Sequence, residues 1–192
     1  MISEWVREQT RDLVVPIARL ISRIGVSPNT LTVVGLLGMV GVGAVLAAGQ
    51  SRLGAALLLL VAALDFLDGA LARLRGRATP FGAFLDSSLD RFAEVAIFFG
   101  LLYYYIRQGA STEVLLVYLT ITGSLLVSYA RARASAAGVE CKVGLMARPE
   151  RIVLLALGLF LDQMYLTLWV LTVLTNLTAI HRVIYVWRVM KG

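Results

Sequence analysis

Residues 52–73 read RLGAALLLLVAALDFLDGALAR, a stretch long and apolar enough to cross the roughly 30 Å hydrocarbon core of a bilayer as one helix. Apolar runs of similar or slightly shorter length lie on both sides of it. They occupy about 31–49, 83–106, 113–135, 150–163 and 165–187. The sequence therefore predicts six transmembrane helices.

The composition is that of a membrane protein and excludes a soluble globular domain. Of the 192 residues, 59% are hydrophobic and 16% are charged, and the mean hydropathy is +0.82. Soluble domains are nearer half apolar and a quarter charged. The net charge of +6 fits loops that face anionic lipid better than it fits nucleic-acid binding, so we expect no nucleic-acid partner. The single cysteine, Cys141, cannot form an internal disulfide bond.

Residues 1–28 precede the first apolar run. Charges between Glu4 and Asp12 exclude a signal peptide. Apolar residues recur at helical spacing from Leu13 to Ile24, with arginines between them, which predicts an amphipathic helix at the membrane interface. A soluble N-terminal helix is the alternative. We expect an all-α integral membrane fold with one domain at 1–192, in which a juxtamembrane helix at 1–28 precedes a six-helix transmembrane bundle at 29–192.

The distribution of basic residues predicts the orientation. With six spans, Arg52 and Arg107 lie on one side of the membrane, and the other 16 of the 18 lysines and arginines lie on the opposite side. The positive-inside rule then places both termini and the active site on the cytoplasmic side of the cell membrane. Tyr103, Tyr104 and Tyr105 would belong to the outer aromatic belt and Trp187 to the inner one. Close helix packing is predicted for the glycines of the first span, Gly35, Gly38, Gly41 and Gly43.

Four carboxylates fall inside the second and third spans: Asp65, Asp68, Asp86 and Asp90. Each costs about 2.5–3.5 kcal/mol to insert, so four of them require compensation. Residues three or four apart share a helix face, and both pairs lie at a similar depth. Hard oxygen ligands from two neighbouring helices predict a site for Mg²⁺ or Mn²⁺. Pairing with Arg73 and Arg91 is one alternative, and a proton or cation transporter is another.

Residues 65–90 contain the pattern Asp-x2-Asp-Gly-x2-Ala-Arg-x8-Gly-x3-Asp-x3-Asp. This pattern resembles the signature of the CDP-alcohol phosphotransferases. All eight fixed positions are present: Asp65, Asp68, Gly69, Ala72, Arg73, Gly82, Asp86 and Asp90. The resemblance covers nearly the whole chain, since the family also has six spans and an N-terminal interfacial helix. It implies a homodimeric enzyme that transfers the phosphatidyl part of a CDP-linked lipid to a small alcohol and releases CMP.

The resemblance also implies roles for single residues. Asp65, Asp68 and Asp86 would bind the metal, and Asp90 would be the general base and a further metal ligand. The residues expected to bind the CDP-lipid are Asn29, Thr32, Gly69, Arg73 and Thr79. For Asn29 and for Ser27, capping of the first transmembrane helix is an equally good interpretation.

A second group of chemically informative residues is basic. The segments Ser128-Tyr129-Ala130-Arg131-Ala132-Arg133, Arg148-Pro149-Glu150-Arg151 and His181-Arg182 lie at the cytoplasmic ends of three spans. Arginine binds phosphate oxygens bidentately, so the cluster predicts an acceptor that carries a phosphate. Snorkelling toward anionic lipid is the alternative, and it suits Arg133 and Lys191.

Within the family, the basic segments resemble those of phosphatidylinositol phosphate synthases. This resemblance implies CDP-diacylglycerol as donor and inositol 1-phosphate as acceptor. The residues that would hold the acceptor phosphate are Ser128, Arg131, Arg148, Arg151 and Arg182. Arg131 departs from the lysine of actinobacterial members, which leaves a CDP-linked ether lipid or another acceptor open. Glycerol 3-phosphate, which would give phosphatidylglycerol phosphate, is the alternative acceptor.

Overall fold

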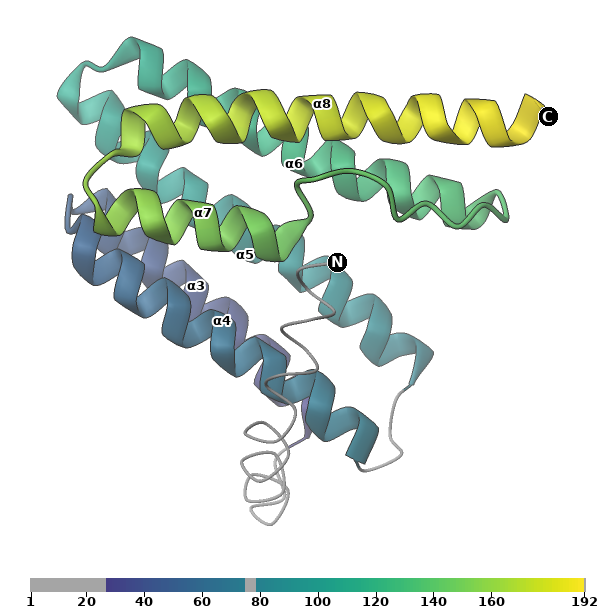
Figure 1. The fold of residues 1–192 in the computed structure, drawn as a ribbon. Coiled ribbons are helices and arrows are strands. Elements are labelled where there is room, and N and C mark those ends of the chain that lie inside the picture. The colour runs from purple at the N-terminus through teal and green to yellow at the C-terminus, as the bar shows by residue number, and fades with distance from the viewer. Residues whose placement is uncertain (1–26, 75–78, 192) are drawn as a thin grey trace. The chain divides into compact units, whose positions relative to one another are not determined.

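The computed structural model describes residues 27–74 and 79–191, except for the side chains of residue 28 and residues 65–74. These ranges hold helices and no strand (Figure 1). The helices are α3 (Pro28–Ala47), α4 (Ser51–Leu74), α5 (Pro80–Gln108), α6 (Ser111–Ala136), α7 (Arg148–Phe160) and α8 (Met164–Lys191). The predicted interfacial helix at 1–28 lies outside the described residues up to position 26.

Each predicted apolar run coincides with one of these helices, and local signals set several of their ends. The hydroxyl of Ser27 accepts a hydrogen bond from the Thr30 amide at 3.1 Å, which caps the start of α3. Pro149 lies in the first turn of α7, where its missing N–H costs nothing. Asp162 takes a left-handed conformation (φ 58°) in the turn between α7 and α8.

Length and composition separate the helices into two groups. Three are long and apolar enough to cross a membrane: Asn29–Ala47, Ser111–Ala136 and Met164–Lys191. Helix α5 is long but carries the charged residues Asp86, Asp90, Arg91 and Glu94. The helix predicted at 150–163 ends at Phe160, and its 13 residues span only about 20 Å.

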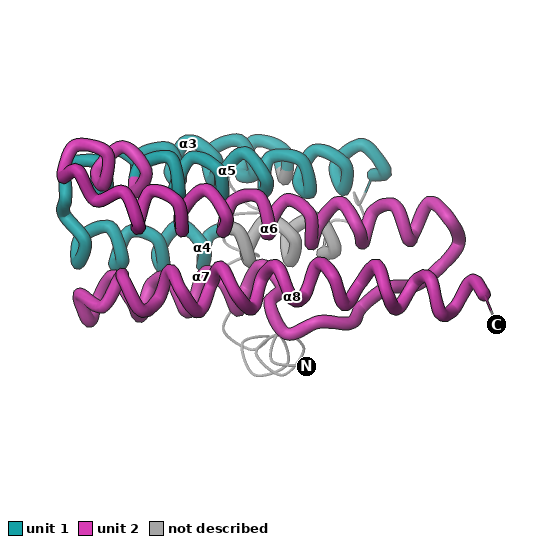
Figure 2. The backbone as a smooth tube through the Cα atoms, turned by 90° about the horizontal axis from the view of Figure 1, so that it is seen from above, with its two compact units in different colours: residues 1–100 teal, residues 101–192 magenta. Residues whose placement is uncertain are grey.

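The chain forms two compact units, residues 1–100 and 101–192 (Figure 2). In the first unit, α3 packs against α4 and α5 through small residues. A side chain at Gly43 would collide with the backbone of Ala96, and one at Gly100 would collide with the backbone of Gly43. Gly38 lies against Val61, whereas a methyl group at Gly41 would meet no atom within 4 Å. The predicted close packing is therefore confirmed at Gly38 and Gly43 and is wrong at Gly41.

In the second unit, α6 and α8 run parallel and are joined by polar side chains. The hydroxyls of Thr120 and Thr172 lie 2.9 Å apart, and both are within hydrogen-bond distance of the Leu116 carbonyl oxygen. The Asn176 amide donates to the Leu119 carbonyl at 3.2 Å and fits into the space left by Gly123. These contacts fix the two helices in one register, because each polar group needs its own partner.

The outer surfaces of the helices are apolar, and several of the buried positions carry polar side chains. On α8, the buried side chains include Thr167, Thr172, Thr175 and Thr178, and the exposed ones include Leu166, Trp169, Val173, Leu177 and Ile180. A water-soluble helix has the opposite arrangement. Exposed apolar surface on this scale is what lipid covers, so the helices belong to a membrane protein.

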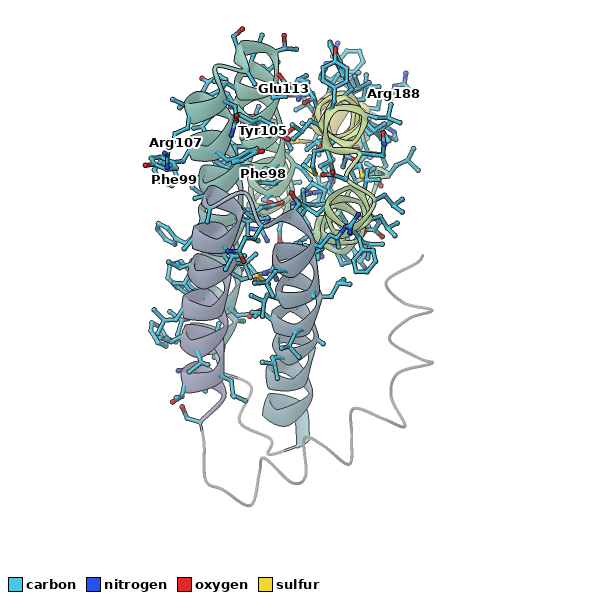
Figure 3. The ribbon with its side chains drawn as sticks, turned by 90° about the vertical axis from the view of Figure 1, so that its left-hand side faces the viewer. Phe98, Phe99, Tyr105, Arg107, Glu113 and Arg188 are labelled. Atoms are coloured by element: carbon cyan, nitrogen blue, oxygen red, sulfur yellow. The ribbon has the colours of Figure 1, made fainter. Side chains whose placement is uncertain are left out.

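Aromatic residues pair with basic ones at the two ends of the second unit. The Arg107 guanidinium lies 5.9 Å from the Tyr103 ring centroid and projects outward from α5 (Figure 3). The Lys191 ammonium lies 4.7 Å from the Trp187 ring centroid near the end of α8. Amphipathic pairs of this kind are typical of the headgroup level of a bilayer.

Candidate active site

Three residues of the signature and its surroundings meet where α3 and α5 begin. The Thr79 hydroxyl accepts a hydrogen bond from the Gly82 amide at 3.0 Å and so caps α5. A methyl group on Gly82 would lie 3.1 Å from this hydroxyl oxygen and 3.3 Å from the Asn29 side-chain oxygen. Gly82 thus leaves room for two oxygens that were predicted to contact the CDP-lipid, and Asn29 and Thr79 are brought together in the first unit.

The signature aspartates lie on continuous helix. Asp65 and Asp68 are three residues apart on α4, and Asp86 and Asp90 are four residues apart on α5. The helical spacing that the metal prediction needs is therefore present. The side chains of Asp65, Asp68, Gly69 and Arg73 lie outside the described residues. Among the side chains that are described, no three acidic, histidine or cysteine residues lie close enough together to hold a metal ion.

Two of the four signature aspartates, Asp86 and Asp90, have described side chains, and these two differ in exposure. Asp86 is exposed, whereas Asp90, one turn further along, is half-buried. The Asp90 carboxylate lies 3.5 Å from the Arg91 guanidinium, which is at the outer limit for a hydrogen bond. Thr32, the remaining donor-site residue with a described side chain, is buried on α3.

Two of the predicted acceptor residues are the most deeply buried arginines of the second unit. The side chain of Arg151 is 2% exposed and that of Arg182 is 4% exposed. Arg151 donates to the Met146 carbonyl at 2.8 Å. Arg182 donates to the Val143 carbonyl at 2.9 Å and to the Val127 carbonyl at 2.7 Å. Both guanidinium groups are thus brought to one short segment, 143–146, of the connection between α6 and α7.

The other three predicted acceptor residues surround this place to different degrees. Ser128 follows Val127 on α6, so it lies next to the backbone that Arg182 contacts, and its hydroxyl donates to the Ser124 carbonyl at 3.2 Å. Arg148 is half-buried in the first turn of α7. Arg131 is exposed near the end of α6. On the solvent side of the connection, a hydrogen bond from Lys142 lowers the pKa of Glu140.

Sequence reasoning missed the part of this site that is built from backbone. The carbonyls of Val143 and Met146 have no signature in the sequence, because every residue has one. Thr178 was also missed, although its hydroxyl accepts a hydrogen bond from the Met146 amide at 3.3 Å. The one available signal was Gly144, a glycine in a polar connection, which adopts a positive φ of 109°.

Comparison with known proteins agrees with the signature. Residues 25–188 match the family described as CDP-alcohol phosphatidyltransferase. The archaetidylinositol phosphate synthase of Methanothermobacter thermautotrophicus is 39% identical, over 96% of this chain and 94% of that protein. The phosphatidylinositol phosphate synthase of Mycobacteroides abscessus is 33% identical, over 92% of this chain and 84% of that protein.

Solved structures give the same result. The Mycobacterium tuberculosis phosphatidylinositol phosphate synthase with bound CDP-DAG superposes with a TM-score of 0.86 and 30% identity, over 92% of this chain and 94% of that one. Its complex with manganese and citrate also gives a TM-score of 0.86, at 31% identity over 91% and 88% of the two chains. With the signature, the helical fold and these matches in agreement, the chain belongs to the CDP-alcohol phosphatidyltransferase family of membrane enzymes.

Proposed function

We propose that the chain transfers the phosphatidyl group of CDP-diacylglycerol to inositol 1-phosphate, giving phosphatidylinositol phosphate and CMP. This acceptor is supported chiefly by the convergence of two buried arginines, Arg151 and Arg182, on one short segment of the second unit. Burying two guanidinium groups is costly, and the cost is offset where an anion binds between them. Serine and free inositol carry no phosphate, so binding either of them would not require a cluster of arginines.

The relatives support a donor of the CDP-lipid type. A solved relative from Mycobacterium tuberculosis holds CDP-DAG, and relatives from bacteria and archaea are named for phosphatidyl- and archaetidylinositol phosphate. We assign donor binding to Asn29, Thr32, Gly69, Arg73 and Thr79. The side-chain oxygens of Asn29 and Thr79 both lie close to Gly82, which supports two of these assignments. The archaeal relative makes a CDP-linked ether lipid the donor to test beside the diacyl form.

The reaction needs a base and a way to stabilise negative charge. In the proposed step, the Asp90 carboxylate takes the proton of an acceptor hydroxyl while that oxygen bonds to the lipid-side phosphorus. The bond from this phosphorus to the CMP oxygen breaks, and CMP leaves with the electron pair. Asp90 suits the task because its carboxylate is only partly buried.

The carboxylates also fit a divalent metal. Carboxylate oxygens spaced three and four residues apart on α4 and α5 form a hard donor set, which suits Mg²⁺ and also Mn²⁺. A relative binds manganese together with citrate. We assign Mg²⁺ to Asp65, Asp68 and Asp86, with Asp90 as a further ligand. When bound, the ion would neutralise charge on the diphosphate of the donor.

We assign the acceptor phosphate to Ser128, Arg131, Arg148, Arg151 and Arg182. Of these four arginines, Arg131 alone is exposed, so it is the residue best placed to meet an acceptor as it arrives from solution. Glycerol 3-phosphate also carries a phosphate, and it is the competing acceptor.

We further propose six membrane crossings in the cell membrane, with both termini and the active site in the cytoplasm, and a homodimer. Thr120 contacts Thr172, and Val127 further along α6 contacts Arg182 further along α8, which supports crossings by α6 and α8 in the same direction. The charge distribution of the loops supports the orientation. The dimer rests on resemblance to the family, and cross-linking in native membranes tests it.

The decisive experiment measures CMP release by the purified protein with Mg²⁺ and either CDP-diacylglycerol or its diether analogue. The acceptors are inositol 1-phosphate, glycerol 3-phosphate, free inositol and serine. We expect turnover with inositol 1-phosphate alone. Turnover with glycerol 3-phosphate instead would replace the acceptor and keep the basic pocket, while turnover with free inositol or serine would contradict the role of the arginines.

A further inference from the structure

The connection between α6 and α7 is the one long irregular segment among the described residues of the second unit. From the end of α6 it turns back and runs beside α8 to reach α7 (Figures 1 and 2). Hydrogen bonds show that it runs antiparallel to α8. Val143 bonds to Arg182, and Met146, three residues later, bonds to Thr178, which lies one turn earlier on α8. Backbone groups that are buried outside regular helices need hydrogen-bond partners, and side chains can supply them.

Three side chains make hydrogen bonds with the backbone of segment 143–146. Arg182 donates to the Val143 carbonyl, Arg151 donates to the Met146 carbonyl, and the Thr178 hydroxyl accepts from the Met146 amide. The two carbonyls hold the guanidinium groups in place, and the Thr178 hydroxyl holds the backbone of the segment through the Met146 amide. Thr178 also donates to the Leu174 carbonyl at 2.7 Å, so its hydroxyl is fixed by its own helix.

Gly144 lets the segment approach α8 closely. A Cβ atom at this position would collide with the Cγ2 methyl group of Thr178. The positive φ of 109° is moreover a conformation that residues with side chains rarely adopt. Segment 143–146 and Thr178 therefore fit each other. Gly144 has no side chain to collide with Thr178, and the Thr178 hydroxyl lies where the Met146 amide can donate to it.

We propose that Thr178, together with Gly144, is a positioning residue for the acceptor phosphate. It holds segment 143–146 so that the Val143 and Met146 carbonyls orient Arg182 and Arg151 toward the acceptor. Thr178 itself touches no substrate. The inference rests on the proposed function, in which these arginines bind the phosphate. It makes a neutral residue a determinant of acceptor affinity while leaving the donor site unaffected.

The test compares three substitutions on α8. Thr178→Val keeps the shape but removes the hydroxyl that accepts from the Met146 amide, and Thr178→Ser keeps the hydroxyl. Thr172→Val removes a buried hydroxyl from the same helix at a place that contacts α6 instead of segment 143–146. For each variant, CMP release gives kcat and the KM values for inositol 1-phosphate and for the CDP-lipid.

A second readout is independent of turnover. Cys141 is the only cysteine of the chain, lies just before segment 143–146 and is 3% exposed. Its rate of reaction with a maleimide therefore reports how often the connection leaves α8. Gly144→Ala, which disturbs the same contact from the other side, provides an independent variant should Thr178→Val fail to fold.

We expect Thr178→Val to raise the KM for inositol 1-phosphate about three- to tenfold, with kcat and the CDP-lipid KM unchanged and faster labelling of Cys141. Thr178→Ser should restore the acceptor KM, and Thr172→Val should leave it unchanged. An unchanged acceptor KM in Thr178→Val, or an equal rise in Thr172→Val, would overturn the positioning role. Wild-type protein that uses no phosphorylated acceptor would instead contradict the proposed function.

Discussion

Gly100 on α5 is a position where one added methyl group tests the packing of the first unit. In Gly100→Ala, the new Cβ would collide with the carbonyl oxygen of Gly43 and would lie 2.7 Å from its carbonyl carbon and 2.8 Å from its Cα. All three atoms are backbone, so no side chain can rotate away. Restoring ordinary contact of 3.4 Å to the carbonyl carbon alone requires the two helices to separate by about 0.7 Å, and the carbonyl oxygen requires more. Overpacking of this kind costs about 1–3 kcal/mol.

Gly41→Ala is the matched control, because it adds the same methyl group to α3 where no atom lies within 4 Å. Both variants gain the same helix propensity, up to about 1 kcal/mol, so their difference isolates the contact. Thermal unfolding in detergent, followed by tryptophan fluorescence, should place Gly100→Ala about 3–10 °C below Gly41→Ala. Equal melting temperatures would refute the close approach of α3 and α5 at this point.

Four further predictions concern the site and one helix end. Asp90→Asn should abolish CMP release with every acceptor and leave CDP-lipid binding, measured by calorimetry, within about twofold; retained turnover would remove Asp90 as the base. Arg182→Ala should raise the acceptor KM by about tenfold or more, while the exposed Arg133→Ala should not. Ser27→Ala should lower the free energy of unfolding by about 1 kcal/mol, measured by thermal unfolding, through loss of the α3 cap. Chelation with EDTA should stop CMP release, and Mg²⁺ or Mn²⁺ should restore it; activity that survives chelation would exclude the metal.

The helices could be predicted because long apolar runs and strong local signals define them. Ser27 and Pro149 occupy the helix starts that their chemistry predicts. The glycines of α3 show the limit of this reasoning. Gly41 and Gly43 look alike in the sequence, but the first is exposed and the second touches the backbone of α5. Which face of a helix meets a neighbour depends on how that neighbour packs, and an apolar helix in lipid gives no amphipathic pattern to reveal it.

The candidate site was predictable to the extent that side chains define it. The spacing of the aspartates and the grouping of the arginines are visible in the sequence because charged residues are rare in membrane helices. The surroundings of Arg151 and Arg182 were not predictable, since their partners in segment 143–146 are backbone carbonyls. Thr178 could not be distinguished from the other threonines of α8 until segment 143–146 was located beside it.

The hydrogen bonds between α6 and α8 have a consequence for how the protein is made. Thr120 and Thr172 are 52 residues apart, so at about 5–20 residues per second the ribosome delivers the second threonine several seconds after the first. During that delay the Thr120 hydroxyl still has a hydrogen-bond partner in the membrane, because it donates to the Leu116 carbonyl of its own helix at 2.8 Å. Helix α6 can therefore wait in the membrane as a stable intermediate, and pairing with α8 completes the second unit once the C-terminal helix has been inserted.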